Sequence, residues 1–224
     1  VLTGADAEAD GMRQIPHIPI APSPPDVKLA NRDGTPPYLA PHFVLPSDKA
    51  RFVGEAVAMV VADTAAAARS AAERIGVDYE VLPAATATSD AMAIGAPCVR
   101  EEHGPNICVD AEIGDKAATE AAFAGAAHVV ALETWVARMT GVPLDLRAAV
   151  GSFDAATGRY TLHAGSGGVV RQKRELATIL GVPEELVRVV SGDVGGNFGT
   201  RNAFYPEFAL VAWASRRIGR PVKW

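Results

Sequence analysis

The chain has 224 residues and a formal net charge of −5, from 21 lysines and arginines against 26 aspartates and glutamates. Hydrophobic residues make up 49% of it, which is enough for a packed core and excludes a disordered or fibrous chain. No basic stripe, no apolar run near the roughly 20 residues of a membrane span and no signal peptide are recognisable, so we expect a cytoplasmic protein without a nucleic-acid partner.

The first predicted feature is a proline-rich segment over residues 11–50. Proline fixes φ and lacks an N–H, so regular helix or central strand is excluded there. Its apolar residues predict an extended segment that lies along a domain, with a disordered linker as the alternative. These residues are Ile15, Ile18, Ile20, Phe43, Val44 and Leu45.

A strand, a helix and a second strand are predicted next. The apolar run Val57-Ala-Met-Val-Val61 is typical of a buried strand, and Asp63 or Thr64 can cap the alanine-rich helix that follows. The alternation in Val77-Asp-Tyr-Glu-Val-Leu82 predicts another strand. The stretch from Pro83 to about His103 is the candidate domain boundary.

The second half of the chain predicts a mixed set of elements. They are a helix from Asp115 to about Ala124, a long strand 128–136, a hairpin of 148–153 with 160–163, a helix 169–180 and a strand 187–190. In the helix 169–180 we expect Val169 to be buried and Glu175 to be exposed. The last helix, with Asn202 as its cap and Gly219 at its end, is apolar on nearly every side and predicted to be buried.

The strongest chemical signal is Gly192-Asp-Val-Gly-Gly-Asn-Phe-Gly199, between a predicted strand and a predicted helix. Its glycines let the backbone approach a ligand closely, and free N–H groups near a helix start can hold an anion. A turn with no ligand is the alternative, because glycine is common in turns. A second cluster, Gly165-Ser-Gly-Gly168, repeats the order strand, glycine turn, helix, and either the two turns converge on one ligand or both are plain turns.

Other common site patterns are missing. Gly199-Thr-Arg201 does not match a P-loop, and the order G-x-x-G-G-x-x-G is not the dinucleotide fingerprint. The histidines lack metal-site spacing, Cys98 and Cys108 cannot form a disulfide framework or a zinc site by spacing, and no Gly-x-Ser-x-Gly elbow occurs. Arg138 and Arg147 are able to bind an anion, but we expect them to pair with Asp145 or Glu133 instead. We expect no metal ligand and no complete catalytic set.

Several segments taken together resemble the xanthine dehydrogenase family, whose members include aldehyde oxidases and the large subunit of aerobic carbon monoxide dehydrogenase. The segments 52–62 and 77–83, with the alanine-rich helix between them, are similar to the family's α/β hammerhead domain. Further similarity lies in 147–150, 154–162, 180–183 and 187–190. The loop Gly192–Gly199 is similar to the family's molybdenum-cofactor loop, usually Gly-Gly-Gly-Phe-Gly.

The resemblance implies an α+β fold in two parts. Residues 1–100 would form a partial α/β hammerhead domain with the proline-rich segment, and residues 101–224 the first part of a molybdopterin-binding domain. The chain would then be a fragment of a large subunit that binds molybdopterin cytosine dinucleotide with its molybdenum. Its partners would be the missing remainder of that subunit and subunits or domains that carry iron–sulfur clusters and FAD.

The resemblance also implies an activity and a set of cofactor-binding residues. A small substrate (an aldehyde, an N-heterocycle or carbon monoxide) would be oxidised with oxygen derived from water. The family's catalytic glutamate lies downstream of Trp224, so we expect no catalytic residue in this fragment, and neither activity nor bound molybdenum in the fragment alone. The cofactor-binding residues carried over by position are Gly167, Gly168, Gly195, Gly196, Asn197, Phe198 and Gly199.

Two of these positions depart from the family pattern. Asn197 replaces a glycine, and Gly167 stands where many relatives carry a glutamine, which argues against a purine substrate. A non-enzymatic binding or assembly module with purely structural glycine turns is the alternative function, and a phosphate-binding domain is a third.

Overall fold

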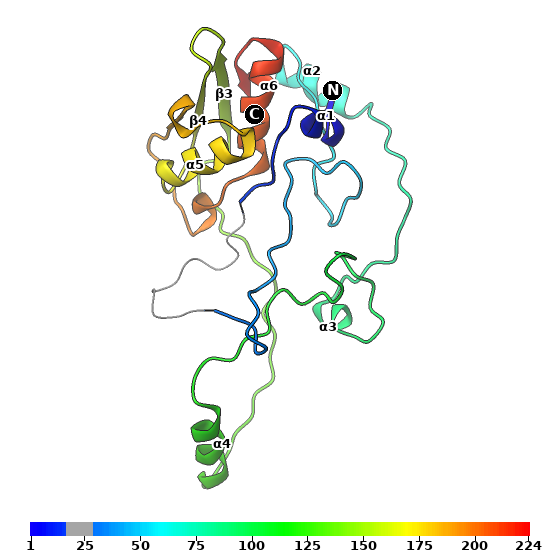
Figure 1. Cartoon of the computed structure of the whole chain (residues 1–224), viewed down its shortest axis with the longest axis vertical. Helices are drawn as coiled ribbons and strands as arrows, with labels where there is room; N and C mark the ends of the chain where they lie inside the picture. The colour runs from blue at the N-terminus through cyan, green and yellow to red at the C-terminus, as the bar shows by residue number, and fades with distance from the viewer. Residues whose placement is uncertain (17–28) are drawn as a thin grey trace. The chain divides into compact units, whose positions relative to one another are not determined.

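The computed structural model describes residues 1–16 and 29–224, which fall into two compact units (Figure 1). The described residues of the first unit are 1–16, 41–83 and 141–224, and those of the second are 29–40 and 84–140. The predicted division of the chain at residue 100 remains a prediction.

Helices and strands are both present, and the predicted α+β class is confirmed. The strands of the first unit are β1 (Leu2–Thr3), β2 (Ala58–Met59), β3 (Ala149–Asp154), β4 (Arg159–Ala164), β5 (Val187–Val190) and β6 (Val222–Lys223). Its helices are α1 (Gly4–Ala9), α2 (Ala65–Ala72), α5 (Val169–Leu180) and α6 (Pro206–Ile218), with 3₁₀ turns η1 (Glu184–Leu186) and η2 (Thr200–Asn202). The second unit holds α3 (Thr88–Ala91) and α4 (Lys116–Gly125). None of the helices in the described ranges has the length and hydropathy that a bilayer crossing requires.

A four-stranded sheet in the order β5-β4-β3-β6 organises the first unit. The predicted hairpin is confirmed as β3 and β4, which pair antiparallel with Phe153 opposite Tyr160. β5 returns parallel to β4, with Tyr160 opposite Val187, and α5 forms the crossover between them. A parallel pair needs such a crossover, because the chain must return to the same end of the sheet before it runs forward again.

The last helix is the centre of the core. Every residue from Phe208 to Ser215 in α6 is buried, as the sequence predicts, and α6 packs on β3. Gly151 permits this approach, because a Cβ there would lie 2.5 Å from the backbone nitrogen of Ala212. The predicted start of the helix is wrong. Pro206 restricts the residue before it to extended backbone, so Tyr205 is the N-cap and Asn202 belongs to η2.

Two predicted strands are not formed. Segments 77–82 and 128–136 have no strand pairing within the described ranges, and Val81 and Val130 are 89% and 92% exposed. Alternating apolar residues favour a strand, but a strand exists only where its N–H and C=O groups pair with a neighbour. The helix caps are better determined locally. Of the two predicted caps of α2, Asp63 and Thr64, the structure has Thr64, and the predicted cap Asp115 of α4 is confirmed.

The helix α5 differs from its prediction in which face is buried. Glu175 is buried and accepts a 2.8 Å hydrogen bond from Arg171 Nε, whereas Val169 is 37% exposed. Leu176 is fully buried as predicted, and Gly181 ends the helix in the left-handed conformation. The helix covers β5 and α6 together, so its buried face is wider than the apolar stripe alone indicates.

The proline-rich segment is anchored where the sequence places its apolar residues. Ile15, Val44 and Leu45 are buried, and Ile15 N–H donates to the His42 carbonyl at 2.7 Å. Arg13 N–H donates to the Ile179 carbonyl in α5 at 2.8 Å. Phe43 is 40% exposed, while Ile18 and Ile20 lie outside the described residues.

Asp10 joins the N-terminal helix α1 to α6. Its carboxylate accepts hydrogen bonds from the buried indole Nε1 of Trp213 and from Arg217 Nε, both at 2.7 Å. The bonds from Arg217, and then from Trp213, lower the pKa of Asp10 from its ordinary value of 3.8. The ionised form is therefore favoured in the folded chain.

Adding a methyl group at Gly151 tests how closely α6 packs on β3. Gly151→Ala is expected to lower the free energy of unfolding by about 1–3 kcal/mol or more, because the new methyl group meets helix backbone that cannot rotate away. Ser152→Ala is the control, since successive strand residues point to opposite faces. Denaturant unfolding measures both, and equal midpoints for the two variants would contradict the packing described.

The Asp10 contact predicts a pH dependence. Because the pKa of Asp10 is lower in the folded chain, its contribution to stability is complete above the unfolded-state value of about 3.9 and is lost as the pH falls through the folded value. Asp10→Asn is expected to destabilise the protein at pH 7, with the difference from wild type shrinking below about pH 4. Asp63→Asn is the control, because its pair with Arg220 is exposed and contributes little. Thermal unfolding across pH 2.5–7 measures both variants; a constant Asp10→Asn deficit would contradict the prediction.

Candidate functional site

Two glycine turns meet at one edge of the four-stranded sheet. Gly165–Gly168 follows β4, and Gly192–Gly199 follows β5. Because β4 and β5 are parallel, their carboxyl ends lie at the same edge, the usual position of ligand sites in sheets of this kind. Ser166 N–H donates to Ser191 Oγ at 3.1 Å, and Gly167 N–H donates to the Arg201 carbonyl at 2.9 Å. The two turns therefore form one connected surface.

The second turn has an unusual backbone. Gly196 and Gly199 have φ of 120° and 83°, and Phe198 lies between them with φ of 49°. A bulky residue in the left-handed region costs on the order of 1–3 kcal/mol, and such residues cluster at functional sites. The Phe198 side chain is 74% exposed, so burial of its ring does not compensate this cost within the described structure.

Asp145 and Arg201 hold the second turn in place. Asp145 Oδ1 accepts the Gly195 N–H at 2.7 Å, and Leu144 N–H donates to the Gly195 carbonyl at 3.0 Å. The Arg201 guanidinium, only 4% exposed, pairs with Asp145 Oδ2 at 3.1 Å and donates to the Asp145 carbonyl at 2.5 Å. A Cβ at Gly195 would lie 2.6 Å from Asp145 Oδ1 and 3.0 Å from the Asp145 backbone nitrogen, so a larger residue there would displace Asp145.

Several backbone donors in these turns remain available. Within the described ranges, no acceptor is found for the N–H groups of Gly196, Asn197 and Phe198, nor for those of the first turn of α5, Val169 to Arg171. A Cβ at Gly168 or Gly199 would meet nothing within 4 Å, so there is open space beside both turns. Free N–H groups beside open space suit a ligand with anionic oxygens.

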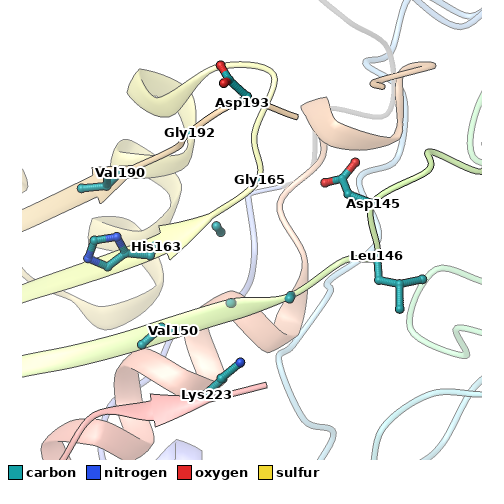
Figure 2. Close-up of a pocket in the computed structure, with 12 residues that line it drawn as sticks. Asp145, Leu146, Val150, His163, Gly165, Val190, Gly192, Asp193 and Lys223 are labelled. Atoms are coloured by element: carbon teal, nitrogen blue, oxygen red, sulfur yellow. The ribbon is translucent and has the colours of Figure 1, made fainter. Parts of the chain in front are cut away.

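A pocket of about 300 Å³ opens at the same edge of the sheet (Figure 2). Asp145, Gly165, Gly192 and Asp193 line it at the turns, while His163 and Lys223 line it from the strands. Its lining includes the carboxylates of Asp145 and Asp193 and the single cation Lys223, so carboxylates outnumber cations there. The N–H groups of the turns, rather than a cluster of cations, are therefore the features that favour an anion.

The structure brings the predicted site residues together in part. Gly167 lies against Asn197 and Asn202, and Gly195 lies against Asp145, whereas Gly168, Gly199 and the Phe198 ring border open space. The described residues contain no group of three or more metal-ligating side chains, and Cys98 and Cys108 are free and exposed. The role of the predicted set in cofactor binding remains a prediction.

Sequence reasoning missed the side chains that support the turns. Arg201 and Asn202 lie two and three residues after Gly199, so proximity to the motif was an available signal for both. Asp145 is 50 residues away from its partner Gly195, and nothing in its local sequence marks it. The predicted pairing of Arg147 with Asp145 or Glu133 is wrong, because Arg147 pairs with Glu207 at 3.2 Å and lies over the Tyr205 ring at 4.0 Å.

Comparison with protein families accounts for both parts of the chain. Residues 99–224, which contain both glycine turns, match the molybdopterin cofactor-binding domain. Residues 24–83 match the aldehyde oxidase and xanthine dehydrogenase a/b hammerhead domain. The chain belongs to the aldehyde oxidase and xanthine dehydrogenase family. Within this family assignment, the edge of the sheet described above lies in the molybdopterin cofactor-binding domain.

Named relatives agree with the family assignment. The chain is 36% identical to the carbon monoxide dehydrogenase large chain of Hydrogenophaga pseudoflava, over 81% of this chain and 24% of the relative. It is 34% identical to the 6-hydroxypseudooxynicotine dehydrogenase complex subunit gamma of Paenarthrobacter nicotinovorans, over 82% of this chain and 22% of the relative. It is similar to the crystal structure of quinoline 2-oxidoreductase from Pseudomonas putida, with a TM-score of 0.74, 34% identity, and coverage of 81% of this chain and 23% of that one. The chain therefore spans about a quarter of the length of these relatives.

The support of the second turn by Asp145 is testable by substitution. Asp145→Asn removes the charge that faces the buried Arg201 guanidinium. Because Asp145 is 41% exposed, we expect a loss of about 1–2 kcal/mol rather than the roughly 3–5 kcal/mol of a fully buried pair. Hydrogen exchange in residues 192–199 should become faster. Asp78→Asn removes an exposed carboxylate as a control, and equal exchange in both variants would contradict the role of Asp145.

Proposed function

We propose that this chain forms part of the molybdenum-cofactor-binding large subunit of an oxidoreductase. The observation that carries the proposal is the meeting of two glycine turns with free N–H groups at the carboxyl ends of β4 and β5. These turns lie within the residues that match the molybdopterin cofactor-binding domain. When bound, the molybdenum cofactor supplies two-electron redox chemistry.

The residues of this chain bind and orient in this proposal. The N–H groups of Gly196, Asn197 and Phe198 donate to anionic oxygens of the cofactor. The first turn of α5 supplies further N–H donors. Glycines at 168 and 199 leave the space in which a bulky ligand approaches the backbone. Asp145 and Arg201 keep the second turn rigid, so the donors are oriented before the ligand arrives.

The finer parts of the function are proposals as well. We propose the cytosine dinucleotide form of the cofactor, partner subunits with iron–sulfur clusters and FAD, and a cytoplasmic location. The substrate belongs to the small molecules that relatives' names indicate, carbon monoxide and N-heterocycles such as quinoline among them. No general base for the oxidation is assigned within this chain.

Cofactor content tests the proposal directly. The protein expressed from its complete reading frame, in a host that makes the cofactor, is expected to contain one molybdenum atom and one pterin per large chain. Elemental analysis measures the metal, fluorescence of the oxidised pterin measures the organic part, and release of cytidine monophosphate on acid hydrolysis identifies the dinucleotide. A protein that contains neither metal nor pterin but associates with partner subunits would instead support a non-enzymatic assembly module.

A further inference from the structure

Two asparagine side chains occupy the space above Gly167. A Cβ at this position would overlap Asn202 Oδ1 and lie 2.5 Å from Asn197 Nδ2. The φ of Gly167 is outside the left-handed region, so its backbone conformation does not demand glycine. The two amides occupy the place of a side chain at position 167, and any larger residue there would have to displace them.

The Asn197 amide uses both of its ends to bind residues that follow it in the chain. Its Nδ2 donates to Asn202 Oδ1 at 2.9 Å, and its Oδ1 accepts the Gly199 N–H at 3.0 Å. Asn202 N–H also donates to the Gly199 carbonyl at 3.2 Å. The Asn202 side chain is therefore held over the first turn by the second.

This arrangement leaves one side-chain donor group of an exposed residue available. The hydrogen-bond partner of Asn202 is at Oδ1, and within the described ranges its Nδ2 has none. Asn202 is exposed and lies beside Gly167, on the surface that the free N–H groups of the turns also border. An amide N–H₂ group there adds a neutral donor for anionic oxygens without adding charge.

We propose that Asn197 is a positioning residue and that Asn202, which it holds over Gly167, is a ligand-contacting donor of the cofactor site. The pair takes the place of a side chain at position 167. The ligand role rests on the proposed function, since the ligand is the anionic molybdenum cofactor. The positioning role rests on the contacts alone.

A double-mutant cycle tests the positioning role without any cofactor. The protein is expressed from its complete reading frame in a strain that cannot make the cofactor, and denaturant unfolding is measured for Gly167→Ala, Asn197→Ala and the double variant. Gly167→Ala is expected to raise the unfolding equilibrium constant at least tenfold, and no more than about threefold when Asn197 is already alanine, because Asn202 is then no longer held over position 167. Equal costs in the two backgrounds would overturn the positioning role.

Asn202→Asp separates the ligand role from a purely structural one. Aspartate keeps an oxygen that accepts from Asn197 Nδ2 and lacks the N–H₂ group, so stability should stay within about twofold of wild type in the unfolding equilibrium constant. Pterin and molybdenum retained after dialysis of the cofactor-loaded protein should fall at least fivefold in Asn202→Asp. They should fall similarly in Asn202→Ala, which is neutral and so excludes charge repulsion as the cause.

The outcomes of the two experiments are distinguishable. Full retention of cofactor in both Asn202 variants would overturn the ligand role while leaving the proposed function intact. A wild-type protein without pterin or molybdenum would contradict the proposed function and the ligand role together. The double-mutant cycle decides the positioning role in either case.

Discussion

The parallel pairing of β4 with β5 is the constraint on which the candidate site depends. Parallel strands end at the same edge of a sheet, so the chain that leaves each strand must turn in the same place. Gly165–Gly168 and Gly192–Gly199 are those turns, and the bonds between Ser166 and Ser191 and between Gly167 and Arg201 join them. A ligand that approaches this edge therefore contacts the backbone of both turns.

The core beneath that edge is built around α6. The helix contacts β3 at the distance that Gly151 allows, and Asp10 ties the N-terminal helix to its other end through Trp213 and Arg217. The 3₁₀ turn η2, which contains Arg201 and Asn202, lies just before α6 in the chain. Arg201 and Asn202 therefore lie just before the N-terminus of α6, the most buried helix. The packing of α6 and the orientation of these two residues are coupled for this reason.

Local sequence signals predicted the elements whose stability is local. The caps Thr64 and Asp115, the β3–β4 hairpin and the burial of α6 all follow from residue type and spacing. The same reasoning failed for segments 77–82 and 128–136, where apolar alternation is present and a pairing strand is not. It also failed for Glu175, because burial of a charged residue depends on what packs over it rather than on its place in the helix.

The sequence by itself determined the family, the α+β class and the location of the two glycine turns, since these depend on motif order and on periodicity along the chain. Only the tertiary structure decided which side chains support the turns. Asp145 reaches Gly195 across 50 residues, and Asn197 and Asn202 fill the space above Gly167. These contacts join segments that are distant in the chain, so local sequence patterns do not predict them.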